Sequence, residues 1–169
     1  GVVVGCKSDK DIVGEYLCVH PGWQTYIVAN DENPALFKAD PSIVPLSTYL
    51  GTVGMPGRTA YFGLLRVGLP KSGETIVVSA ASGAVGTVVG QMGKILGCRV
   101  VGVAGGEKKC SYVKNELGFD DCIDYKAGNL EDDLTAACPD GIDIYFENVG
   151  GPVSKAVAKL LNPGARVPI

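Results

Sequence analysis

The sequence predicts an α/β protein in which a doubly wound parallel sheet follows a short β-rich segment. Residues 75–80 and 99–104 are β-branched runs on either side of a helical segment, which together make one strand–helix–strand unit. Strand-like and helix-like segments keep alternating up to residue 169, as in the right-handed crossovers of a parallel sheet. The 169 residues suffice for one domain with a core and part of a second.

Composition and charge exclude several classes of function. Charged residues make up 20% of the chain and hydrophobic residues 46%, and the formal net charge is −3, which argues against a nucleic-acid or membrane-surface role. No apolar run is long enough to span a membrane and residues 1–4 have no signal-peptide pattern, so we expect a cytoplasmic protein. The six cysteines contain no C-x-x-C pair, so we expect free, mostly buried thiols and no metal site.

Residues 1–47 have the pattern of small antiparallel strands joined by turns. The expected strands are residues 2–4, 16–19 and 25–28. We expect Trp23 and Tyr26 to pack this β piece. So few strands cannot close a core alone. The segment therefore either docks on the second half or belongs to a larger β domain, and we place the domain boundary between residues 47 and 48.

Residues 48–169 contain the alternating elements, with Gly97, Gly118 and two Pro-Gly-containing turns as helix stops. In chain order we expect a helix that has Pro56 in its first turn and leads into Pro70, strands at 75–80, 99–104, 121–125, 142–146 and from 165, and helices at 87–96, 107–117, 130–137 and 153–161. A doubly wound dinucleotide-binding fold has roughly six strands. Because this chain supplies five, we expect the sheet to be truncated at its C-terminal side.

The loop after the first strand, residues 81–86, keeps the second and third glycines of the G-x-G-x-x-G motif and has Ala81 in place of the first. The missing side chain at Gly83 would let a pyrophosphate approach the backbone, and Gly86 would let the following helix lie close to the strand. This pattern predicts a Rossmann domain. The alternative is a Gly/Ala turn that only packs a crossover helix.

The tip of the second strand carries Gly105 and Gly106, where an NAD enzyme is expected to have an Asp or Glu about 20 residues past the glycines. The missing carboxylate leaves room for a 2′-phosphate, to which Lys108 or Lys109 can supply positive charge. The cofactor is therefore predicted to be NADP(H). The alternative is that Glu107 turns inward and the lysines form a solvated helix face.

Two further strand tips carry side chains that can contact the same ligand. Tyr125, after the third strand, can stack on or hydrogen-bond the phosphate–adenosine end, although a tyrosine at a strand end often only packs. Asn148 follows the fourth strand in a polar, glycine-rich run, and it can both donate and accept near a nicotinamide. The alternative for Asn148 is a helix N-cap.

Three segments in the same order carry a family resemblance, namely residues 51–63, residues 80–86 with Gly90-Gln91, and residues 145–151. They closely resemble the zinc-independent medium-chain dehydrogenase/reductases, and most of all the group of prostaglandin, alkenal double-bond and curcumin reductases. The resemblance implies that residues 1–47 end a GroES-like catalytic domain and that residues 48–169 form an incomplete Rossmann NADP-binding domain. It also implies an enzyme that reduces the C=C bond of α,β-unsaturated aldehydes or ketones with NADPH, without a metal, in a family that tends to form homodimers.

Carried over residue by residue, the resemblance implies three groups of cofactor contacts. Gly83, Ala84 and Val85 would contact the pyrophosphate, Lys109 and Tyr125 the 2′-phosphate end, and Met55, Thr59 and Asn148 the nicotinamide side. Ser82, Gly86 and Gly105 complete the predicted site. No general acid is assigned, because the substrate-facing tyrosines of this family lie in stretches outside residues 1–169. Two alternatives stay open, a quinone reductase of the same superfamily and a noncatalytic NADPH-binding module.

Overall fold

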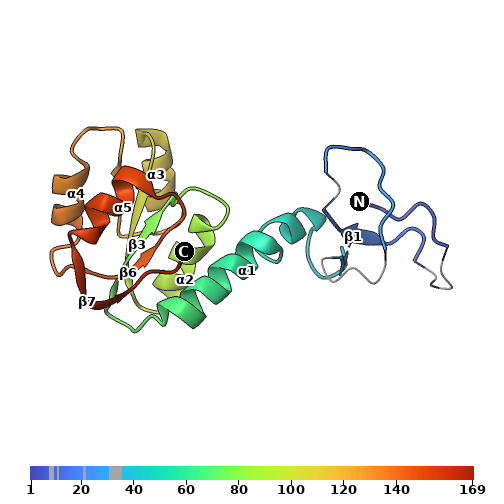
Figure 1. Ribbon diagram of the computed structural model, residues 1–169, viewed down its shortest axis with the longest axis horizontal. Coiled ribbons are helices and arrows are strands. Elements are labelled where there is room, and N and C mark those ends of the chain that lie inside the picture. The colour runs from blue at the N-terminus through green and yellow to red at the C-terminus, as the bar shows by residue number, and fades with distance from the viewer. Residues whose placement is uncertain (8–9, 11, 21, 31–35) are drawn as a thin grey trace. The chain divides into compact units, whose positions relative to one another are not determined.

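The structure is a computed structural model that describes residues 1–7, 10, 12–20, 22–30 and 36–169 (Figure 1). The chain divides into two units, Gly1–Met55 and Pro56–Ile169. The boundary predicted between residues 47 and 48 lies inside the first unit. The GroES-like origin of the first segment stays a prediction.

In the first unit, strand β1 (Tyr16–Cys18) pairs antiparallel with β2 (Phe37–Ala39), and a 3-10 helix, η1 (Leu46–Leu50), follows. Val2 makes an isolated bridge to Tyr16. The antiparallel pairing was predicted, but two details were wrong. Residues 25–28 form no strand, and β2 lies in a segment for which no strand was expected.

The aromatic packing of the first unit also differs from the prediction. Trp23 and Tyr26 are exposed. The buried aromatic residue is Tyr49, whose ring centroid lies 6.5 Å from that of Phe37 and whose hydroxyl donates to the Asp40 carbonyl at 3.1 Å. A three-residue strand has too little periodicity to be recognised in sequence, so the pairing partner decides its place.

The second unit contains the predicted parallel sheet, in the order β5-β4-β3-β6-β7. Its strands are β3 (Thr75–Ser79), β4 (Arg99–Ala104), β5 (Asp121–Asp124), β6 (Ile142–Phe146) and β7 (Leu161–Arg166). Every residue of the central strand β3 is buried, as expected for a strand covered on both faces. The doubly wound α/β fold predicted from the sequence is therefore confirmed.

Helices cover both faces of this sheet (Figure 1). The helices that cover the faces are α2 (Gly86–Ile95), α3 (Glu107–Asn115), α4 (Leu130–Ala137), α5 (Gly151–Ala158) and the π-helical segment η2 (Gly63–Gly68), which continues α1 (Met55–Phe62). One face holds a core that includes Leu64 and Val89 from η2 and α2. The opposite face holds a core that includes Leu134 and Val157 from α4 and α5.

The last strand begins earlier than predicted. The sequence indicated a helix up to residue 161 and a strand from residue 165, but α5 ends at Ala158 and β7 runs from Leu161 to Arg166. Leu161 pairs with Ile142 and Arg166 with Ile144, so the residues between them form a bulge. The Pro-Gly pair that was interpreted as a helix stop lies within this bulge, where an irregular strand tolerates it.

Glycines let α2 lie unusually close to its neighbours. A Cβ atom added at Gly90 would lie 1.7 Å from Cζ of Phe119, so the aromatic ring packs directly on the helix backbone. A Cβ at Gly93 would lie 2.8 Å from Cγ2 of Val100, a residue of β4. These contacts hold α2, and with it the start of the helix, against the sheet.

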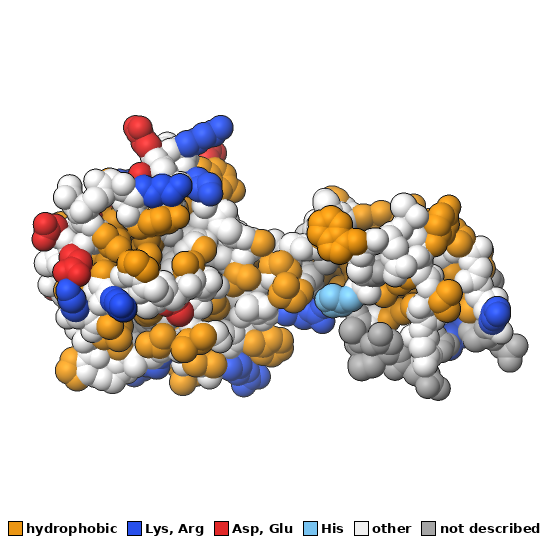
Figure 2. All heavy atoms as spheres, turned by 45° about the horizontal axis from the view of Figure 1, so that its top comes forward, with side chains coloured by type: hydrophobic (Ala, Val, Ile, Leu, Met, Phe, Trp, Pro, Cys, Tyr) orange, Lys and Arg blue, Asp and Glu red, His pale blue; other side chains and the backbone are white. Residues whose placement is uncertain are grey.

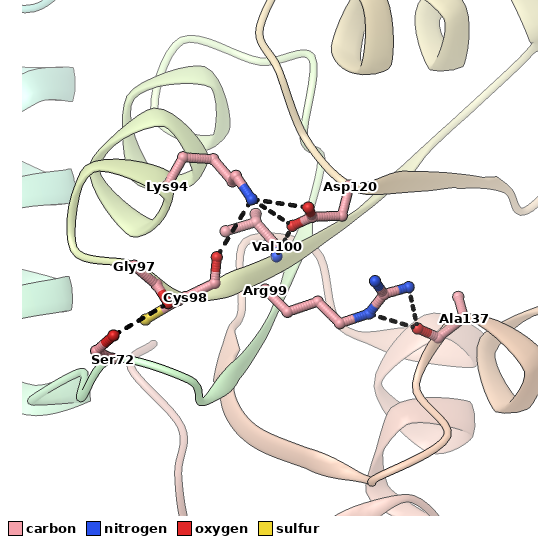
Figure 3. A network of polar contacts seen from close by, with 8 residues as sticks. All are labelled: Ser72, Lys94, Gly97, Cys98, Arg99, Val100, Asp120 and Ala137. Carbon is pink, nitrogen blue, oxygen red and sulfur yellow. Dashed lines mark hydrogen bonds and ion pairs between the residues drawn. The ribbon is translucent and has the colours of Figure 1, made fainter.

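A polar network holds the amino end of β4 (Figure 3). Lys94 Nζ lies 2.7 and 2.8 Å from the two carboxylate oxygens of Asp120, and the Val100 N–H donates to the same carboxylate at 2.7 Å. Arg99 donates through Nε and Nη2 to the Ala137 carbonyl at 3.1 and 2.9 Å. The network joins α2, β4 and the end of α4 at the sheet edge opposite the strand tips, so it stabilises the fold.

None of the six cysteines is in a disulfide bond, and four of them, Cys98, Cys110, Cys122 and Cys138, are buried, as the sequence predicted. Within the described ranges, no helix is both long and apolar enough to cross a bilayer, and no cluster of three metal-binding side chains occurs. Acidic and basic side chains lie interspersed on the face drawn in Figure 2.

Candidate functional site

The strand order of the sheet reverses between β3 and β6, which are hydrogen-bonded neighbours. The helix after β3 covers one face and the helix after β6 covers the other. In open parallel sheets, ligands bind beyond the carboxyl ends of the strands at such a switch point. The loop 80–86 and the loop 147–150 are therefore the segments on which a site would be built.

The loop after β3 makes its tight turn with Ala80, which has a left-handed φ of +47°. Ala81, at the position of the motif's first glycine, is buried and donates its N–H to the Val103 carbonyl at 3.1 Å. A Cβ atom at Gly86 would lie 2.4 Å from the Ala80 carbonyl oxygen and 2.9 Å from Cα of Ala81. The third glycine of the motif therefore has the packing role that the sequence predicted for it.

The start of α2 presents unpaired donors. The Gly83 N–H donates to the Ala80 carbonyl at 2.8 Å, and the Thr87 N–H donates to the Gly83 carbonyl at 2.9 Å. In the described part of the chain, no backbone carbonyl accepts from the N–H groups of Ala84, Val85 or Gly86. Unpaired N–H groups at the first turn of a ten-residue helix form a binding site for an anion such as a phosphate.

The tip of β6 is hydrogen-bonded to the tip of β3 through Ser79 and Asn148. The Asn148 N–H donates to Ser79 Oγ at 2.7 Å, and Asn148 Nδ2 donates to the Ser79 carbonyl at 2.8 Å. The side chain of Asn148 therefore bridges the two strands at the switch point. The alternative of a helix N-cap is not observed, because α5 begins at Gly151 with Gly150 as its N-cap residue and no side-chain cap.

Glu147, next to Asn148, accepts hydrogen bonds from several donors at the same place. They include the N–H groups of Val149 and Gly150, at 2.6 and 2.8 Å, and the Ser79 hydroxyl at 3.0 Å. Burial raises the pKa of Glu147, but these hydrogen bonds lower it by more, so its pKa lies below the ordinary value. Glu147 is thus an anion at neutral pH.

The tips of β4 and β5 lie side by side, with Tyr125 over Gly105. A Cβ atom at Gly105 would lie 2.9 Å from both Cε1 and the hydroxyl oxygen of Tyr125, so only glycine leaves room for this ring. Asp124 accepts from the N–H groups of Gly106 and Lys126 at 2.8 and 3.0 Å, and these hydrogen bonds lower its pKa. Tyr125 stays 46% exposed, so it can still receive a ligand.

Lys109 lies on the first turn of α3, next to this pair of tips, and is exposed. Its N–H donates to the Gly106 carbonyl at 3.0 Å. Glu107 and Lys108 are exposed as well. Glu107 therefore does not turn inward, so that part of the alternative is wrong, whereas the exposed lysines agree with its other part, a solvated helix face.

The predicted site residues fall into three places. Ser82, Gly83, Ala84, Val85 and Gly86 form the loop and helix start after β3, and Asn148 lies beside the tip of that strand. Gly105, Tyr125 and Lys109 lie at the neighbouring tips of β4 and β5. Thr59 is on the exposed side of α1, and Met55, 60% exposed, is the last residue of the first unit. The cofactor contacts of all these residues stay predictions.

Sequence reasoning missed the roles of Ser79 and Glu147 in this site. Both are polar residues that directly end or follow an apolar strand at the carboxyl edge of the sheet. That position was the available signal, because a polar side chain there needs a partner on the neighbouring strand tip. Which partner it finds depends on the strand order.

Comparisons with known proteins show which family and which relatives the chain is similar to. Residues 84–169 match the family described as "Zinc-binding dehydrogenase". The chain is 51% identical over 156 residues to an NADPH-dependent curcumin reductase of Escherichia coli, covering 92% of this chain and 45% of the relative. It is 48% identical over 169 residues to prostaglandin reductase 1 of Oryctolagus cuniculus, covering 99% of this chain and 48% of the relative.

Among solved structures, the crystal structure of CurA from Vibrio vulnificus in complex with NADPH superposes with a TM-score of 0.87 at 52% sequence identity. The match covers 94% of this chain and 47% of CurA. The chain thus spans about half the length of the relatives that it matches.

Proposed function

The chain belongs to the zinc-binding dehydrogenase family, and from this premise we propose that it is the cofactor-binding part of an NADPH-dependent oxidoreductase. We infer further that the whole protein reduces the C=C bond of α,β-unsaturated aldehydes or ketones. The observation that carries the proposal is the combination of unpaired N–H groups at the start of α2 with a second strand tip that offers glycine and Lys109 in place of a carboxylate. The names of the relatives support the same chemistry.

In this proposal the pyrophosphate binds at the start of α2. The N–H groups of Ala84, Val85 and Gly86 donate to its oxygens, and the helix dipole favours its negative charge. Gly83 leaves the backbone open to close approach, and Ser82 borders the same loop. The Gly83 N–H itself is engaged within the turn, so we assign Gly83 a steric role.

The 2′-phosphate end binds at the tips of β4 and β5. Lys109 supplies a positive charge on an exposed side chain that can reach the phosphate, and the exposed ring of Tyr125 offers a face for the adenosine. Gly105 holds that ring by leaving space beneath it. NADH lacks the 2′-phosphate and would gain nothing from Lys109, which is the physical basis of the proposed preference for NADPH.

The nicotinamide end is assigned to Asn148 and Thr59 of the second unit, and the contact of Met55, which belongs to the first unit, stays a prediction. When bound, NADPH supplies a hydride for the β-carbon of the enone, and negative charge builds on the carbonyl oxygen. The protein has to hold two reactants in place and offer donors to that oxygen, which requires neither a metal nor a strong base. The proposed partner is thus a small enal or enone, and a homodimer and a cytoplasmic location stay predictions.

Isothermal titration of the 169-residue chain with NADPH and NADH tests the cofactor assignment. We expect clear preference for NADPH and a loss of at least about tenfold in Lys109→Ala, because a charge-assisted hydrogen bond contributes about 1.5–3 kcal/mol. Lys108→Ala is the matched control and should change the affinity less. Equal affinities for the two cofactors would contradict the assignment. The rates at which the full-length protein reduces enones and quinones distinguish an enone reductase from a quinone reductase.

A further inference from the structure

The Glu147 carboxylate accepts hydrogen bonds from the loop that follows it, from the neighbouring strands β3 and β6, and from α5. Its Oε1 atom accepts from the N–H groups of Val149 and Gly150, which follow it in the loop, and from the Ser79 hydroxyl at the end of β3. All three contacts are between 2.6 and 3.0 Å. One oxygen therefore holds the loop 147–150 in a fixed turn and joins it to the neighbouring strand.

The second oxygen, Oε2, holds the carboxylate from the other side. The Tyr145 hydroxyl donates to it at 2.8 Å, and the Ser154 hydroxyl of α5 donates to it as well. Burial, as the main cause, raises the pKa of Tyr145 to about 12, so this hydroxyl keeps its proton and acts as a donor at neutral pH. The carboxylate is thus fixed through both of its oxygens.

The Ser79 backbone carbonyl orients the Asn148 amide, and the Ser79 hydroxyl joins the Asn148 backbone to Glu147. The Ser79 carbonyl can only accept, so the atom of the Asn148 amide that faces it at 2.8 Å is the NH₂ group. Ser79 Oγ in turn donates to Glu147 and accepts the Asn148 N–H at 2.7 Å. With its NH₂ group engaged on β3, the exposed Asn148 side chain offers its carbonyl oxygen, an acceptor, to a ligand.

We propose that Glu147 is a positioning residue that fixes the Asn148 amide as a hydrogen-bond acceptor for the nicotinamide half of the cofactor. This inference rests on the proposed function. The chemical group recognised is a donor, either a hydroxyl of the nicotinamide ribose or the N–H of the carboxamide. Glu147 acts through Ser79 and Asn148 and touches no reacting atom.

The network requires an acceptor at Oε1, because the Val149 and Gly150 N–H groups can only donate. The Tyr145 and Ser154 hydroxyls at Oε2 can also accept, so a glutamine could satisfy the network with its NH₂ group turned toward them. Glu147→Leu removes the acceptors and leaves the Val149 and Gly150 N–H groups without them. The turn 147–150 and the orientation of Asn148 should then loosen, while the tips of β4 and β5 are unaffected.

The test compares two ligands on the 169-residue chain by isothermal titration. NADPH contains both halves of the cofactor, whereas adenosine 2′,5′-bisphosphate contains only the half assigned to Tyr125 and Lys109. In Glu147→Leu we expect the affinity for NADPH to fall at least about fivefold, as for loss of one to two hydrogen bonds, and that for the bisphosphate to stay within about twofold. Glu147→Asp, which retains an acceptor one methylene shorter, should recover part of the NADPH affinity.

A double variant tests the route through Asn148. If Glu147 acts by positioning Asn148, Glu147→Leu combined with Asn148→Ala should bind NADPH no more weakly than Asn148→Ala alone. Unchanged NADPH affinity in Glu147→Leu would overturn the inference. Equal losses for both ligands would also overturn it, because they would mean general damage to the fold. If the unaltered chain binds the bisphosphate but shows no added affinity for NADPH, the inference fails while the 2′-phosphate site stands, and binding of neither ligand would refute the proposed function itself.

Discussion

Replacing Gly86 by alanine should separate the packing role of the loop from its binding role. The added Cβ atom would lie 2.4 Å from the Ala80 carbonyl oxygen and 2.9 Å from Cα of Ala81. Both are backbone atoms, and Ala80 already has a φ of +47°, a conformation that costs a non-glycine residue about 1 kcal/mol. The turn therefore has little freedom to move away from the methyl group.

The expected size of the effect follows from two opposed contributions. Overpacking a well-packed site costs about 1–3 kcal/mol, and replacing glycine in a helix returns up to about 1 kcal/mol. Because Gly86 is the first residue of α2, the second contribution is at the low end. We expect Gly86→Ala to lower the free energy of unfolding by about 1–2 kcal/mol. This corresponds to a melting temperature lower by about 5 °C or more.

Gly83→Ala is the matched control within the same loop. Its Cβ atom would lie 3.1 Å from the Ala80 carbonyl oxygen, a tight contact that a shift of a few tenths of an ångström relieves. The stability should stay within about 0.5 kcal/mol, since alanine also restricts the unfolded chain, while the affinity for NADPH should fall. Urea unfolding and titration with NADPH measure the two quantities. If Gly86→Ala is as stable as the unaltered chain, the close approach of α2 to the turn does not constrain this position and the argument fails.

Three further predictions concern packing, binding and pH. Gly90→Ala should destabilise the second unit by about 2 kcal/mol or more in urea unfolding, because its Cβ atom would lie 1.7 Å from the Phe119 ring. Phe119→Leu should lower the free energy of unfolding less in the Gly90→Ala background than it does alone. Tyr125→Ala should weaken binding of adenosine 2′,5′-bisphosphate several-fold with little change in melting temperature, and an unaltered affinity would exclude the ring from the site. Burial raises the pKa of Asp120, but hydrogen bonds from Lys94 and a backbone N–H lower it by more, so its folded pKa lies below the ordinary 3.8. The stabilisation is then fully present above about pH 4 and is lost as the pH falls through the folded value, so Asp120→Asn should flatten the decline in unfolding free energy that begins as the pH falls below about 4.

Much of the second unit could be predicted from local patterns. The bounds of β4, α4 and β6 are the predicted ones, because each is an apolar or amphipathic run with a clear stop at both ends. The predicted start of β7 was wrong, because Pro163 and Gly164 were interpreted as the stop of the preceding helix. In the structure the two residues lie within the strand, in its bulge. In the first unit, β2 is three residues long and has no periodicity that a pattern could reveal.

The amino-acid sequence alone determined the doubly wound fold, the glycine loop after the first strand and the strand tip without a carboxylate. These features depend on side-chain periodicity and on glycine, which act over a few neighbouring residues. Only the tertiary structure decided that β3 and β6 are neighbours, that Ser79 therefore meets Glu147 and Asn148, and that Tyr125 lies over Gly105. Ser79 and Asn148 are 69 residues apart in the chain. Their contact arises from the order in which the strands pair, which no local pattern encodes.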